Sequence, residues 1–151
     1  MQTTVNKKLA FGVPGSFYDN TGRRVDPYTV EEGAIALAYT VNSSDPSKAD
    51  LGGDGVFAGI AVNTKEYIIN GVTASMTFRE GDIAQLATRG RIVLKLSDAV
   101  TVGQACFYNE TTGALKPGTA GATIADYVEI KGSQFILVNA LANENSVLQL
   151  A

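Results

Sequence analysis

Turn signals that recur at short intervals constrain the fold of this chain more than any other feature of its sequence. They separate short runs rich in apolar and β-branched residues, such as "AIALAYTV" at 34–41 and "RIVLKLS" at 91–97. A spacing of roughly 8–12 residues between turns is typical of an all-β sandwich or barrel. The one candidate helix, "VEEGAIALAY" at 30–39, contains Gly33, which weakens a helix interior. We therefore predict an all-β fold, a single small barrel or sandwich, and the sequence does not distinguish a closed barrel from two packed sheets.

Several of the predicted turns are centred on a glycine. Asn70-Gly71 is a strong hairpin signal between two short apolar runs. Arg89-Gly90, between "DIAQLAT" and "RIVLKLS", predicts a second tight turn. Lys131-Gly132-Ser133 predicts a turn between "IADYVEI" and "QFILVNA", and Gly113 ends the polar loop of a hairpin that starts at "QACFYN". We expect separate strands on the two sides of each turn.

The chain has 151 residues, and 45% of them are hydrophobic, as in one globular domain with its own core. We predict that the folded unit spans 31–151 and follows an extended N-terminal arm at 1–30. The arm contains "FGVPGSFYDNTGRRVDPYTV" (11–30), where prolines, glycines and aromatics follow neither a helical nor a strand period. These aromatics either bury against a neighbouring subunit or fold back over the chain's own domain. We favour the neighbour.

Charge is spread unevenly along the chain. The net charge is −3 at pH 7, but residues 1–24 carry a net +3, residues 25–64 a net −5 and the remainder a net −1. A basic arm followed by an acidic band suits contact between neighbouring molecules, and ordinary surface scatter is the alternative. The acidic total also argues against nucleic acid as the main partner.

Histidine, which many catalytic and metal sites use, is missing from the chain, and cysteine occurs once. The chain has no histidine and no tryptophan, and its one cysteine is Cys106. These absences argue against a histidine-based catalytic triad, a zinc site and an internal disulfide. We expect Cys106 to be a buried small hydrophobe, and we expect Asp50 and Asp54 to lie in a solvated loop, with calcium as the alternative. We therefore predict no catalytic residue, no cofactor and no metal, and no membrane span or signal peptide.

Three segments of the sequence resemble a known family. They are "AFGVPGSFYDNTGRRVDPYTV", "GVFAGIAVNTKEYI" and "GRIVLKLSDAVTVGQACFYNETTGALKPG". Together they are similar to the structural cement (head-decoration) proteins of tailed bacteriophages. The resemblance implies a non-enzymatic virion protein on the outer surface of the icosahedral head. It also implies that the protein is made in the bacterial host cytoplasm, bridges major capsid protein subunits, and forms a homotrimer or, alternatively, a dimer.

The resemblance directs attention to the arm as the contact surface. Aromatic side chains that find no place in the arm can bury against a partner, prolines lower the cost of ordering, and arginines bind carboxylates. The residues that we expect at the interface with the capsid or a neighbouring subunit are Phe11, Pro14, Phe17, Tyr18, Arg23, Arg24 and Tyr28.

Two other functions remain open at this stage. One is another virion component, such as a tail-tube or head–tail joining protein, which would form rings or tubes. The other is a carbohydrate-binding β-sandwich displayed on the virion, and the absence of tryptophan argues against it because such sites usually stack aromatic rings on sugars.

Overall fold

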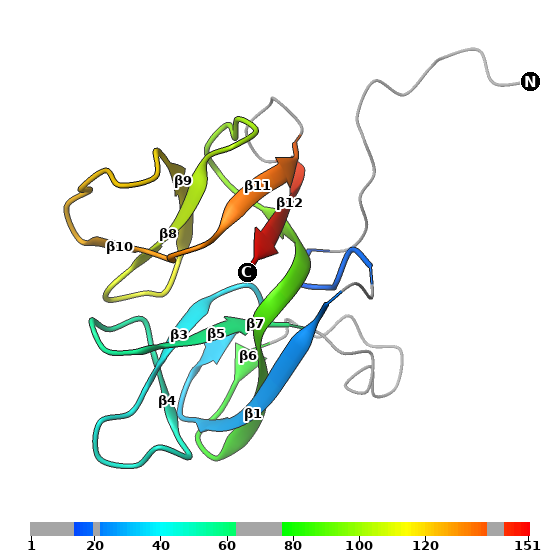
Figure 1. Ribbon diagram of the computed structural model, residues 1–151. Helices are drawn as coiled ribbons and strands as arrows, with labels where there is room; N and C mark the ends of the chain where they lie inside the picture. The colour runs from blue at the N-terminus through cyan, green and yellow to red at the C-terminus, as the bar shows by residue number, and fades with distance from the viewer. Residues whose placement is uncertain (1–13, 20–21, 63–76, 139–143) are drawn as a thin grey trace, which may run out of the picture.

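The structure is a computed structural model that describes residues 14–19, 22–62, 77–138 and 144–151 (Figure 1). These residues form twelve β-strands and no helix, so they include no apolar helix long enough to cross a membrane. The all-β prediction is confirmed. The strands are β1 (Arg24–Val30), β2 (Gly33–Ala34), β3 (Ala38–Val41), β4 (Ala49–Leu51), β5 (Phe57–Ala61), β6 (Thr77–Phe78), β7 (Asp82–Lys95), β8 (Ala105–Asn109), β9 (Leu115–Gly118), β10 (Tyr127–Glu129), β11 (Gln134–Leu137) and β12 (Asn145–Leu150).

The long strand β7 organises the largest sheet. The sheet has seven strands in the order β11-β12-β7-β5-β3-β4, and β1 is an additional partner of β7. All of these pairs are antiparallel. The first part of β7 pairs with β1 and β5, whereas residues 90–95 pair with β12. One strand therefore joins two groups of strands that pair with different parts of its length.

A second sheet, with the strand order β10-β8-β9, shares its core with the first. Cys106 and Tyr108 from β8 belong to the same buried cluster as Ile60, Ile92 and Phe135 from the large sheet. A two-stranded sheet of β2 and β6 is also present. No sheet closes on itself within the described ranges, so the barrel form of the prediction is not confirmed.

The predicted tight turn at Arg89-Gly90 is wrong, because β7 runs through both residues without interruption. Gly90 has a φ of +119°, and a Cβ atom there would lie 3.0 Å from the ring of Phe17 and 3.1 Å from the Cα of Arg23. Glycine is required because another chain segment approaches the strand closely, and the register between β1 and β7 shifts at the same place.

Two other turn predictions are confirmed. Residues 131 and 132 turn between β10 and β11, and Gly113, with a φ of +70°, lies in the connection between β8 and β9. The predicted hairpin at Asn70-Gly71 lies outside the described residues.

The N-terminal segment, where it is described, lies along β7 of the same chain. The amides of Gly15 and Tyr18 donate to the carbonyls of Val93 and Arg91, both at 2.8 Å, and β1 then continues this pairing along β7. Residues 24–30 of the predicted arm are thus a strand of the large sheet. Residues 1–13 lie outside the described residues, so an extended arm there stays a prediction.

Candidate interaction surface

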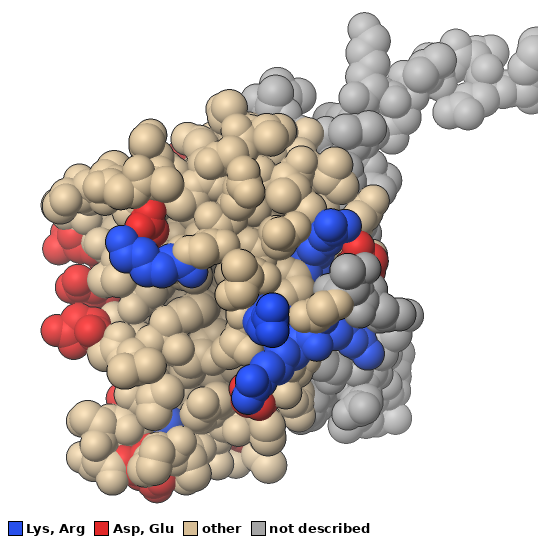
Figure 2. Space-filling view, viewed as in Figure 1, with Lys and Arg blue, Asp and Glu red and all other residues tan. Residues whose placement is uncertain are grey.

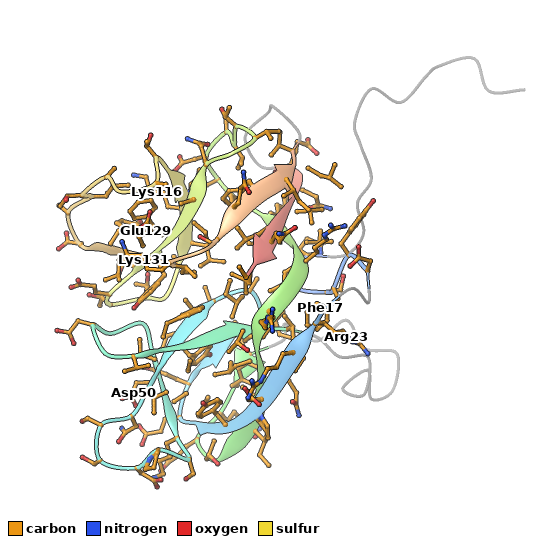
Figure 3. All side chains as sticks on the ribbon, viewed as in Figure 1. Phe17, Arg23, Asp50, Lys116, Glu129 and Lys131 are labelled. Carbon is orange, nitrogen blue, oxygen red and sulfur yellow. The ribbon has the colours of Figure 1, made fainter. Side chains whose placement is uncertain are left out.

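Four of the five arginines of the chain gather where β1 meets β7. Arg24 lies directly opposite Arg89 in the pairing of the two strands, and Arg23 contacts Gly90, the next residue of β7. Arg91 follows on the same strand. We call Arg23, Arg24, Arg89 and Arg91 the arginine patch. Basic side chains gather over this region in Figure 2, and Figure 3 shows Arg23 beside Phe17 at the side of β1 and β7.

The arginine patch is ordered by neighbouring side chains but is only partly neutralised. The Arg24 Nε lies 3.4 Å from an oxygen of Asp26, and the Arg91 Nη1 lies 3.1 Å from an oxygen of Asp19. Arg89 forms no ion pair with any other described residue. The four arginines and two aspartates sum to a net charge of +2. Because ion pairs this exposed stabilise a protein by at most about 1 kcal/mol, the guanidinium groups remain able to exchange partners.

The aromatic side chain of Phe17 helps to fix the arginine patch to the sheet. The Arg23 guanidinium lies 5.4 Å from the centre of the Phe17 ring, a cation–π contact. Phe17 is half-buried and packs on the core cluster that contains Ile92. The segment before β1 is thus fixed to the sheet by backbone hydrogen bonds and by one aromatic side chain, so the arginine patch stands on a rigid base.

The other predicted interface residues differ in how exposed they are. Tyr28, like Phe17, is partly buried and packs on the chain's own core, in a second cluster that contains Val30. Pro14 and Tyr18 are exposed, Tyr18 to 40%. Phe11 lies outside the described residues. Two aromatic side chains of the segment, Phe17 and Tyr28, therefore serve the chain's own fold in part. Among the described residues of the segment, Tyr18 is the large apolar side chain that is exposed to solvent.

Arg89 and Arg91 are not among the residues predicted at the interface, because a glycine that follows Arg89 in the sequence is also typical of a tight turn. Residues i and i+2 of a strand lie on the same face. In hindsight the pattern Arg-Gly-Arg inside a β-rich run was a signal for two basic side chains on one face. What the pattern does not contain is their proximity to Arg23 and Arg24, which arises from the pairing of β1 with β7.

Three acidic residues from separate loops gather elsewhere on the molecule. Asp54 lies between β4 and β5, Glu110 between β8 and β9, and Asp126 just before β10. The backbone ties these loops together, since the Gly53 amide donates to the carbonyl of Glu110 at 2.6 Å and the Glu110 amide donates to the carbonyl of Asp126 at 3.0 Å. We call Asp54, Glu110 and Asp126 the acidic loops.

The acidic loops are exposed, and none of their three carboxylates forms an ion pair within the described part of the chain. Burial raises the pKa of the nearby Tyr108 hydroxyl, and the negative charges of Glu110 and Asp54 raise it further. In Figure 2 acidic side chains line the left edge of the molecule, across the face from the basic side chains over β1 and β7. Lys116, Glu129 and Lys131 lie between these regions in Figure 3, and Lys131 pairs with Glu129 at 2.8 Å.

The remaining surface features of the described residues include no cluster of metal ligands. Among the described residues, no three carboxylates or thiols are close enough together to hold a metal ion. Asp50 accepts hydrogen bonds from the Asn42 amide at 3.1 Å. Cys106 is buried, as predicted, and its burial raises the pKa of the thiol far above the ordinary value. A groove of about 410 Å³ between Ile35–Leu37 and Leu94–Ser97 is largely apolar.

Comparison with known proteins gives two matches. The family model described as "Structural cement protein (E217 gp24/Pam3 gp6)" matches residues 1–151. A chain of the solved structure "The capsid of Myoviridae Phage XM1" has the same fold, with a TM-score of 0.68 and 14% sequence identity over 99% of this chain and 96% of that chain. A search of curated protein sequences finds no match.

Proposed function

This chain belongs to the structural cement protein family of phage heads, and we propose that it binds the outer surface of the head and bridges neighbouring major capsid protein subunits. The observation that carries the proposal is the family match over the whole chain. The predicted cement role is thereby confirmed, and with it a place in the virion among capsid proteins. The outer surface and the bridging of subunits are our inference from that role.

The contact with the capsid is proposed to run along the N-terminal segment. Phe11, Pro14, Phe17, Tyr18, Arg23, Arg24 and Tyr28 remain the candidate residues. Pro14 and Tyr18 support this reading because they are exposed on a segment whose backbone is already paired with β7, so little conformational entropy is lost when a partner covers them. Phe17 and Tyr28 contribute by fixing the segment to the chain's own core.

The proposed bridging role requires no catalysed reaction. A protein that bridges subunits at many equivalent positions can stiffen a shell through contacts that are individually weak, because each copy is held at two places. We infer a non-enzymatic function, in which side chains contact neighbouring proteins and no bond is made or broken.

The experiment is co-sedimentation of the purified protein with empty heads that lack it, before and after the shell expands. Saturable binding to heads, together with a higher melting temperature of the shell, is the expected result. Binding to neither form of the shell would contradict the outer-surface proposal. Rings or tubes of the purified protein in electron micrographs would then favour the alternative, a tail-tube or head–tail joining protein.

A further inference from the structure

We propose that the arginine patch of one copy binds the acidic loops of a second copy, so that neighbouring cement molecules contact each other head to tail. This goes beyond attachment to the capsid, because the contact joins two copies of the same chain and can be measured without any shell.

The arginine patch is suited to carboxylates. Guanidinium groups bind carboxylates through two parallel hydrogen bonds, which lysine cannot do. Arg24 and Arg91 already lie 3.4 Å and 3.1 Å from carboxylate oxygens of their own chain, and Arg89 has no such partner among the described residues. The patch therefore has spare capacity for acidic side chains and is held in place by strands β1 and β7.

The acidic loops are the matching surface that this chain itself provides. Asp54, Glu110 and Asp126 carry a net charge of −3 and are exposed. Two backbone hydrogen bonds join their loops, so the three residues lie on adjoining loops rather than on independent segments. Val56, exposed to 74%, lies two residues from Asp54 and adds an apolar group to the same surface.

Charge complementarity favours a second copy over other occupants. The chain as a whole has a net charge of −3, so the rest of its surface repels the long, uniform negative charge of nucleic acid. A small basic surface on such a chain is better suited to a small group of carboxylates on a protein. A two-fold contact through the arginine patch would place arginines against arginines. A contact between the patch of one copy and the loops of the next uses two different surfaces. When the loops of the first copy do not return the contact, it is heterologous, and such contacts close into rings when the rotation allows, as in a trimer.

The test uses two complementary variants of the full chain. In the first, Arg24→Glu and Arg89→Glu reverse the patch, and in the second, Asp54→Arg and Glu110→Arg reverse the loops. All four side chains are exposed, so both variants are expected to fold. The matched control is Lys48→Glu with Arg79→Glu, two exposed basic residues outside the patch that produce the same change in net charge as the first variant.

Self-association is measured by sedimentation velocity at low salt and again at about 1 M salt, where charges are screened within about 3 Å. The unmodified protein is expected to associate at low salt and to dissociate at high salt. Each reversed variant is expected to associate at least about tenfold more weakly, and the control is expected to match the unmodified protein. An equimolar mixture of the two variants is expected to regain association, because each reversed surface then meets an opposite charge.

Three results would overturn the proposal. The first is that the unmodified chain stays monomeric at about 1 mM and low salt, which corresponds to negligible affinity. The second is that the mixture of variants does not regain association. The third is that the patch variant alone loses binding to heads while both variants leave self-association unchanged, which would assign the patch to the capsid protein. Binding of the unmodified protein to heads is scored separately, so failure of the cement role is distinguishable from failure of this contact.

Discussion

Replacing Gly90 by alanine tests whether a close approach of the N-terminal segment shapes the centre of the fold. The new Cβ atom would lie 3.0 Å from the Phe17 ring and 3.1 Å from the Cα and Cβ of Arg23, and the residue would keep a φ of +119°. Backbone strain of this kind costs about 1–3 kcal/mol, and overpacking of a closed contact costs about 1–3 kcal/mol. We expect the free energy of unfolding to fall by about 3 kcal/mol, which lowers the melting temperature of a chain of this size by about 6–12 °C.

Gly81→Ala is the control for the strain alone. Gly81 has a φ of +88°, but no atom lies within 4 Å of the position that its Cβ would occupy. Thermal unfolding followed by circular dichroism compares the two variants, and hydrogen exchange at the amides of Tyr18 and Val93 reports whether the segment leaves β7. An equal loss of melting temperature in the two variants, with unchanged exchange at these amides, would refute the reasoning, because it would leave the contact with Phe17 and Arg23 without an energetic role.

Four further predictions concern the core. Phe135 is fully buried, and Phe135→Ala is expected to lower the free energy of unfolding by about 3–5 kcal/mol in denaturant titrations. The buried Ser133 hydroxyl accepts a hydrogen bond from the Cys106 amide at 3.0 Å and donates one to the Ile130 carbonyl at 2.6 Å; Ser133→Ala is expected to cost about 1–3 kcal/mol by the same measurement. The Cys106 thiol is expected to react with a thiol reagent only after unfolding, since burial raises its pKa, and reaction at a similar rate in the native protein would contradict this. Burial raises the pKa of Tyr39 from 10.0 to about 12, so the hydroxyl loses its proton at a lower pH in the unfolded chain than in the folded protein. The contribution of Tyr39 to the free energy of unfolding is therefore expected to be fully present below pH 10 and to fall by about 2–3 kcal/mol as the pH rises to 12. Denaturant titrations at several pH values, with Tyr39→Phe as the reference, measure this loss.

The fold class could be predicted because it depends on local patterns. Alternating apolar residues and evenly spaced turn residues favour strands whatever their partners are, and the turns at Lys131-Gly132 and Gly113 form where predicted. The same kind of local pattern predicted a turn at Arg89-Gly90 that does not form. A glycine in a β-rich segment allows either a reversal of the chain or a close approach by another segment, and the neighbouring residues do not reveal which one occurs.

The interaction surface could be predicted only in part. Arg23 and Arg24 were identified because they lie in an unusual N-terminal segment, whereas Arg89 and Arg91 became relevant only through the pairing of β1 with β7. We favoured burial of the segment's aromatics against a neighbouring subunit over their folding back on the chain's own domain. Phe17 and Tyr28 pack in part on the chain's own core. Their contacts with a capsid stay predictions.

The sequence by itself determined that this chain is all-β, that it has no histidine, and that it resembles the cement proteins, a prediction that the family match confirms. Each of these follows from residue types and short spacings. The tertiary structure alone decided that β7 is one strand, that β1, β5 and β12 share it, and that four arginines form one patch. The physical reason is that strand pairing joins segments far apart in the chain, and the register that brings them together is set by the packing of the whole core rather than by neighbouring residues.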